Sequence, residues 1–321
     1  MSMFVRKGRD VVIRRMIAED IEEVREVGQI AWSDLAMHDV GRRFKYPKRS
    51  EKIVAAYLWK DPQGCFVAEE KGKIVGSAVC HVCGKVGWTG PLEVLPSYQD
   101  HGIGKRLLNA CEARIIERGC AVIGLETLPH LPKNLHFYLS SGYRPDKTVL
   151  IMEKVLGHLD ENVEQVHEMT LPSLDADLEK ISRLSQRVHH QLDHSLDAEA
   201  ILRKDLGHVY LLEDGDRTLG CALLHTYQRG EESAYSSVKA VLIDPAAPDP
   251  AVVLDRLLAK CEMGSLEEGK EKTITRFAVG DPQLYQRLLS RTYLLKGANL
   301  RLIKKGEYNE RSRWSITSWA G

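Results

Sequence analysis

The feature that most constrains the fold is a pattern that runs through the sequence twice. The stretch CFVAEEKGKIVGSAVCHV returns later as VYLLEDGDRTLGCALLHT, with Gly220 at the place of Gly76. KRLLNACE returns as DRLLAKCE, and LHFYLSSGY returns as LYQRLLSRTY. The copies are offset by about 144 to 157 residues, which is far longer than the repeat of a solenoid. We therefore predict two domains of one fold, residues 1–157 and 158–321.

Within each copy, the order of apolar patterns predicts helices and strands together. Residues 11–17 alternate like a strand, and residues 18–32 carry apolar side chains at helical spacing. A hairpin, a third strand, a helix ending near Gly119, a strand, a short helix ending near Gly142 and a last strand follow. The expected class is α/β, with a mixed central sheet in each of two tandem domains.

Composition and charge argue against several classes of function. The chain has 321 residues with 45 basic and 45 acidic side chains, so its formal net charge is zero, unlike that of a dedicated nucleic-acid-binding protein. No apolar run approaches the ~18 residues of a membrane span, and the first residues lack the apolar core of a signal peptide. We expect a cytoplasmic protein that binds neither nucleic acid nor membrane.

The cysteines and histidines do not form a complete metal motif. Cys80 and Cys83 make up the only CxxC, and they lie in a strand pattern, where positions three apart point to opposite faces. No second CxxC completes a zinc site. We expect a helix in which His190 and His194 share a face at i,i+4, a spacing that can bind metal, but the sequence places no third ligand beside them. We expect reduced thiols and no bound metal.

The stretch LEVLPSYQDHGIGK carries the most chemical information. An apolar strand pattern ends at Pro96, and a long amphipathic helix pattern follows Gly104 directly. Glycines at 102 and 104 allow backbone N–H groups to approach an anion without an intervening Cβ. The start of the helix adds free N–H groups and the positive end of its dipole. The stretch predicts a pyrophosphate-binding loop, although it matches neither the P-loop nor the Rossmann pattern.

Gln99, Gly102 and Gly104 form a Q-x-x-G-x-G motif between strand and helix, and this motif resembles that of the GCN5-related N-acetyltransferase (GNAT) family. GLET through NLHFYLSSGYRP and the opening VVIRRMIAEDIEEV resemble further motifs of the family, so the resemblance covers residues 10–155. It implies an enzyme that transfers an acetyl group from acetyl-CoA to a primary amine of a small molecule or peptide. The alternative is a non-catalytic acyl-CoA-binding sensor that acts through protein contacts.

The resemblance also implies where acetyl-CoA lies. The strand near residues 88–95 would splay from the strand at 121–126, and the pantetheine arm would enter between them. Main-chain groups of Val94 and Leu95 would contact the arm. Asn134, which follows two prolines in PHLPKN, would replace a CoA-binding asparagine that the family carries near residue 131. The residues expected around the pyrophosphate are Gln99, Asp100, His101, Gly102, Ile103, Gly104 and Lys105.

For catalysis, the resemblance implies a proton donor for the leaving thiolate at Tyr138. It implies a general base at Glu126, which ends a strand twelve residues earlier. Glu93 is the second candidate for the base, and water is the third. Two structural roles stay open: Tyr138 as a packed or CoA-bonded helix residue, and Glu126 as an acid paired with a lysine.

The second copy lacks these groups. Alignment through RLL puts Gly102 and Gly104 opposite Val252 and Leu254, and alignment through the closing tyrosines puts Tyr138 opposite Leu288. The loop DPAAPDPAVV carries three prolines, each without an N–H for a phosphate. We predict that this copy binds no CoA. It would instead wall the acceptor cleft, pack against the first copy or form the face of a homodimer.

Overall fold

The computed structural model describes residues 10–41, 44–157, 163, 165–227 and 233–319. The first half contains β1 (Val12–Arg15), α1 (Ile21–Val40), α2 (Glu51–Lys60), β2 (Cys65–Glu70), β3 (Lys73–Cys83), β4 (Val86–Val94), α3 (Ile103–Glu117), β5 (Val122–Thr127), α4 (Pro132–Leu139) and β6 (Arg144–Val155). The second half contains β7 (Val166–Glu168), α5 (Leu174–Val188), α6 (Ser195–Arg203), β8 (Gly207–Asp214), β9 (Arg217–His225), β10 (Tyr235–Ile243), α7 (Pro250–Glu267), β11 (Lys272–Ala278), α8 (Pro282–Ser290), β12 (Leu294–Lys305) and β13 (Ile316–Thr317).

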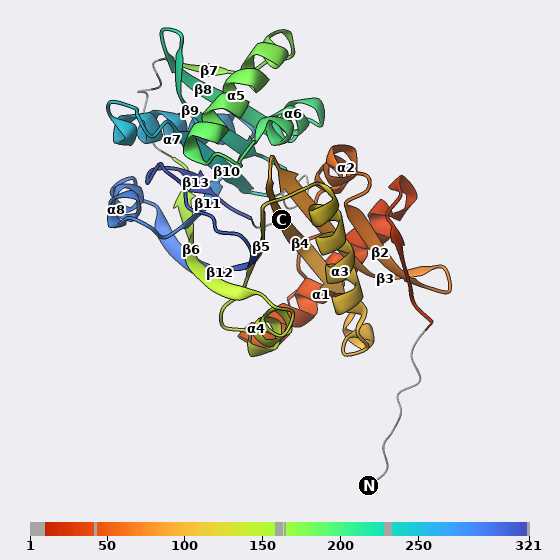
Figure 1. Ribbon diagram of the computed structural model, residues 1–321. Helices are drawn as coiled ribbons and strands as arrows, with labels where there is room; N and C mark the ends of the chain where they lie inside the picture. Colours follow the sequence, from red (N-terminus) through yellow and green to blue (C-terminus); the bar gives the residue numbers. More distant parts are fainter. Residues whose placement is uncertain (1–9, 42–43, 158–162, 164, 228–232, 320–321) are drawn as a thin grey trace.

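The two halves exchange their last strands within one continuous sheet. The sheet runs in the order β1-β2-β3-β4-β5-β12-β6-β11-β10-β9-β8-β7. Strand β12 of the second half pairs with β5, with Leu300 opposite Thr127, whereas β6 of the first half pairs with β11, with Met152 opposite Thr275. Figure 1 shows β6 and β12 side by side between the halves. The predicted boundary at residue 157 therefore divides the sequence but not the sheet.

Equivalent ion pairs fasten the two exchanged strands. Lys304 of β12 bonds to Glu112 of α3 in the first half. Lys154 of β6 bonds to Glu262 of α7 in the second half, with Nζ 2.7 Å from Oε2. The two lysines lie 150 residues apart in the sequence, and so do the two glutamates. The duplication is thus visible in side-chain contacts as well as in the order of the elements.

The apolar core also crosses from one half to the other. Helix α3 buries Leu107, Cys111 and Ile115 against the first half of the sheet, as its helical spacing predicts. A second cluster joins Trp88 and Val122 of the first half to Val188, Leu206 and other buried residues of the second. Burial of apolar area between the halves stabilises their relative placement.

The α/β class and the tandem arrangement expected from the sequence are confirmed by this architecture. Each half has the predicted order of strand, helices, hairpin, third strand, long helix, strand, short helix and last strand. Across the part of the chain that is described, no helix is both long and apolar enough to cross a membrane.

Candidate functional site

Strands β4 and β5 run side by side only at their beginnings. Their register pairs Val86, Gly87 and Trp88 with Val122, Ile123 and Gly124. Beyond this point β4 continues to Val94 and β5 to Thr127 without further pairs between them among the described residues. The opposite edges of both strands are occupied, β4 by β3 and β5 by β12. The two inner edges therefore separate beyond Trp88, as the resemblance implied.

The loop after β4 presents backbone N–H groups at the start of α3. Gly102 caps the helix with a left-handed φ of 76°, and its carbonyl accepts the N–H of Arg106 at 3.1 Å. Within the described residues, the N–H groups of residues 102–105 have no protein acceptor. A Cβ at Gly102 would meet no protein atom within 4 Å. The unbonded N–H groups at this helix start can bind an anion.

Side chains from the loop and from α4 enclose this helix start. The amide of Gln99 donates to the Val94 carbonyl at 3.2 Å, which ties the loop to the end of β4. Lys133 of α4 lies 3.0 Å from Oε1 of Gln99 and 3.3 Å from a carboxylate oxygen of Asp100. The structure thus brings Gln99 and Asp100 of the loop next to α4, the helix on which Asn134 lies. Sequence reasoning missed Lys133, a cation directly beside the expected Asn134.

Tyr138 lies on the face of the sheet that α3 covers. It packs against a buried cluster that contains Leu108 of α3 and Leu125 of β5. The rings of Phe137 and Tyr143 lie 4.9 and 6.0 Å from its ring, centroid to centroid. Burial raises the pKa of the Tyr138 phenol to about 12. The hydroxyl therefore keeps its proton at neutral pH.

Glu93 and Glu126 point to the opposite face of the sheet. Their neighbours Val94 and Leu125 lie on the α3 side, and successive residues of a strand alternate between faces. The Glu93 carboxylate accepts the indole N–H of Trp32 at 2.7 Å and a guanidinium N–H of Arg49 at 3.0 Å. Glu93 therefore lies beneath α1 and the segment before α2, where the first half faces away from α3.

Glu126 is enclosed by groups of the second half. Its side chain is 0% exposed, and Oε1 accepts the Arg301 guanidinium at 2.9 Å. The backbone N–H of Trp319 donates to the same oxygen at 3.0 Å, and the Ser318 hydroxyl lies 3.4 Å from Oε2. These contacts correspond to the structural alternative for Glu126, with an arginine in place of the expected lysine.

In the second half, the short strand β13 lies where the gap between β4 and β5 has its counterpart, beside β10. Strand β10 pairs with β11 from Tyr235 to Val238. From Ala240 onward it pairs instead with β13, with Ala240 opposite Thr317 and Val241 opposite Ile316. A short strand of protein therefore occupies the edge of β10 that corresponds to the free edge of β4.

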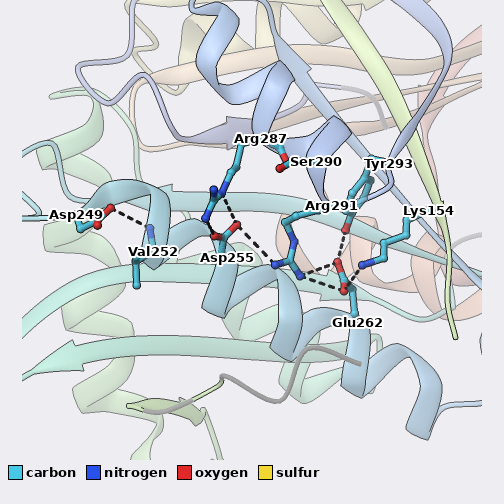
Figure 2. A network of polar contacts seen from close by, with 9 residues as sticks. All are labelled: Lys154, Asp249, Val252, Asp255, Glu262, Arg287, Ser290, Arg291 and Tyr293. Atoms are coloured by element: carbon cyan, nitrogen blue, oxygen red, sulfur yellow. Dashed lines mark hydrogen bonds and ion pairs between the residues drawn. The ribbon is translucent and has the colours of Figure 1, made fainter. Parts of the chain in front are cut away.

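The start of α7 also differs from that of α3. Helix α7 begins at Pro250, and the Asp249 carboxylate accepts the N–H of Val252 at 3.1 Å (Figure 2). Asp255 forms an ion pair with Arg287 nearby. Figure 2 shows the network continuing from Asp255 through Arg291 to Glu262, which also contacts Lys154 and Tyr293. Where the first half presents open N–H groups, the second half has a carboxylate.

The cysteine and histidine segments form a separate cluster between the halves. Asp197 accepts the Cys83 thiol at 2.9 Å and contacts Nδ1 of His194 at 2.8 Å. These three side chains could hold a metal ion, but Lys60 already lies 2.8 Å from the other Asp197 oxygen and balances its charge. The expectation of a helix through His190 and His194 was wrong. Helix α5 ends at Val188, and His194 precedes α6.

Comparison with known proteins agrees with this geometry. The model of the Acetyltransferase (GNAT) family matches residues 31–143. The "Acetyltransferase SG1711" of Sodalis glossinidius is 32% identical over 106 residues, which cover 33% of this chain and 75% of the relative. The "N-alpha-acetyltransferase MAK3" of Arabidopsis thaliana is 38% identical over 74 residues, 22% of this chain, so the chain spans only 38% of that relative.

Solved structures share the whole fold. One from Pyrococcus horikoshii has a TM-score of 0.69 at 16% identity and covers 100% of this chain and 99% of its own. A tandem GNAT protein from the clavulanic acid biosynthesis pathway has a TM-score of 0.57 at 13% identity, covering 94% of this chain and 99% of its own. At these identities the likeness shows the fold alone. Together with the sequence matches, it leads to one conclusion: the chain belongs to the acetyltransferase (GNAT) family.

Proposed function

We propose that this protein is an acetyl-CoA-dependent N-acetyltransferase that acts on a primary amine of a small molecule or peptide. Residues 1–157 form its catalytic domain, and residues 158–321 form a degenerate copy. The observation that carries the proposal is the separation of β4 from β5, which leads to the open N–H groups of residues 102–105. This arrangement offers a strand edge for an extended arm and an anion site at the end of it.

The residues present fit acetyl-CoA. The N–H groups of residues 102–105 bind the pyrophosphate, and Lys105 and Lys133 add positive charge beside it. The free edge of β4 pairs with the pantetheine arm as a further strand would. Bound acetyl-CoA supplies a thioester carbonyl for attack by the amine and a thiolate that leaves. A main-chain N–H of β4 stabilises the charge that develops on that carbonyl oxygen.

The proton donor and the base act from opposite faces of the sheet. Tyr138, on the α3 side, holds its proton at neutral pH and donates it to the departing sulfur. Glu93, on the other side, takes the proton of the amine, directly or through water. Both carboxylates bind an arginine. We assign the base to Glu93 rather than Glu126, because the Arg49 side chain beside Glu93 is 15% exposed, whereas Glu126 and Arg301 are 0% and 1% exposed.

Two observations support the proposal that the second half binds no CoA. Strand β13 pairs with β10 where an arm would have to lie. The Asp249 carboxylate caps α7 where a phosphate would have to bind, and two negative groups would repel each other there. The second half instead contributes Arg301 and Trp319 to the face of the first half that receives the acceptor.

The anion site is tested by Gly102→Val. A branched side chain at a φ of 76° strains the loop and enters the space in front of the N–H groups. Titration calorimetry should show acetyl-CoA binding weakened at least tenfold, about 1.4 kcal/mol. Gly72→Val is the matched control, because Gly72 has a φ of 78° and equally open surroundings in the β2–β3 turn. Equal affinity in folded Gly102→Val and wild-type protein would contradict the proposal.

The proton donor is tested by Tyr138→Phe, which keeps the ring and removes the hydroxyl. Turnover should fall by about 10²–10⁴-fold, while the affinity for acetyl-CoA stays close to that of the wild type. Tyr285→Phe on α8 of the second half makes the same change away from the site and should keep full turnover. A wild-type rate in Tyr138→Phe would contradict the assignment of Tyr138 as the proton donor. Acetyl-CoA binding without turnover on a broad panel of amines would favour the alternative function, a non-catalytic acyl-CoA-binding sensor.

The base is tested by comparing Glu93→Gln with Glu126→Gln. Glu93→Gln should lower turnover and flatten the loss of rate at acidic pH that carboxylate protonation causes. Glu126→Gln should keep the pH profile and lower the free energy of unfolding by about 3–5 kcal/mol, because Arg301 loses its buried partner. Glu93→Gln also removes the partner of Arg49, so the pH–rate profile, and not urea denaturation, distinguishes the two assignments. If Glu126→Gln changes the pH profile and Glu93→Gln does not, the assignment is reversed.

A further inference from the structure

A pair of tryptophans lies at the inner end of the gap between β4 and β5. Trp88 and Gly124 form the last pair that joins the two strands. The indole of Trp319 lies parallel to that of Trp88, at an interplanar angle of 9° and a centroid distance of 6.1 Å. It is 2% exposed and packs against Gly124, where a Cβ would lie 2.4 Å from the ring. Only glycine at 124 admits this indole.

Several contacts of the second half fix the position of Trp319. The backbone N–H of Trp319 donates to the Glu126 carboxylate, and the Arg301 guanidinium carbon lies 4.2 Å from the centre of the Trp319 indole. Arg301 also donates to the Thr317 carbonyl at 3.1 Å, and the Tyr308 ring packs edge-on at 5.0 Å. The indole is therefore held by β5, β12 and its own backbone. On the α3 side of the preceding rung, where Gly87 pairs with Ile123, Ile115 fills the space against Gly87.

The direction of the bound arm follows from the position of the anion site. The open N–H groups lie at the far end of the gap, after Val94, where β4 and β5 are no longer paired. Val94 lies six positions after Trp88 on β4, at most about 20 Å at the rise of a strand, because a bulge between Thr89 and Leu92 shortens this stretch. An extended arm anchored at the loop therefore runs toward Trp88, and its acyl group points at the closed end.

We propose that Trp319, supplied by the second half, closes the inner end of the acyl site and limits the donor to a short acyl chain such as acetyl. The inference rests on the proposed function. The inference gives the degenerate half a specific role. Residues 316–317 pair with β10 within the second half, and Trp319, two residues later, stacks on Trp88 at the end of the gap between β4 and β5.

The test is a series of acetyl-, propionyl-, butyryl- and hexanoyl-CoA with one amine acceptor. Wild-type protein should prefer acetyl-CoA, with kcat/KM falling at least tenfold by butyryl-CoA, in line with the cost of added methylenes in a closed pocket. Trp319→Ala should raise the ratio of butyryl to acetyl at least tenfold. Trp319→Phe keeps a ring beside Arg301 and should show a smaller shift, toward propionyl. Competition binding with the same thioesters gives a readout independent of turnover.

Trp314→Ala is the matched control. Trp314 is partly buried against the core of the second half and precedes β13 in the same segment. Its replacement should leave the preference for acyl length unchanged. An unchanged preference in folded Trp319→Phe and Trp319→Ala, with acetyl-CoA still bound, would overturn this inference and leave the proposed function standing. If no acyl-CoA binds to the wild-type protein, both this inference and the proposed function are contradicted.

Discussion

The pairing of β12 with β5 is the constraint on which the rest of the structure depends. Strand β5 satisfies the backbone groups along one of its edges with a strand from the other half. Its remaining edge is then free to separate from β4 beyond Trp88. The exchange also brings Arg301 and residues 317–319 onto the face of the first half that lies away from α3. The site of one half is therefore built partly by the other.

The two copies of the fold differ in the loop before the long helix and at the edge of the preceding strand. In the first half, the loop to α3 turns at Gly102 and leaves its N–H groups open. In the second half, α7 begins at Pro250 under an aspartate cap, and β13 pairs along the edge of β10. The core positions and the paired ions Glu112–Lys304 and Glu262–Lys154 persist in both. Both halves keep the same core packing, whereas in the described part of the chain only the first half keeps two strands that separate with no other strand between them.

Local pattern was sufficient to predict the elements, the duplication and the loop at Gly102, because periodicity and glycine placement act over short stretches. The strand exchange could not be predicted, since β6 and β12 occupy the same place in their repeats and either could pair with β5. The partner of Glu126 lies 175 residues away, so its ion pair left no signal near residue 126. The helix expected through His190 was wrong because His189 adopts extended backbone and Asp193 accepts the N–H of Ser195.

The proposed function requires that each chain bind one acetyl-CoA, between β4 and β5. A crystal structure with excess acetyl-CoA, together with the stoichiometry from calorimetry, tests this directly. We expect one molecule per chain, with its pyrophosphate at the N–H groups of residues 102–105 and its acyl end beside Trp319. Density for a CoA between β10 and β11, with β13 displaced, or two molecules per chain, would contradict it.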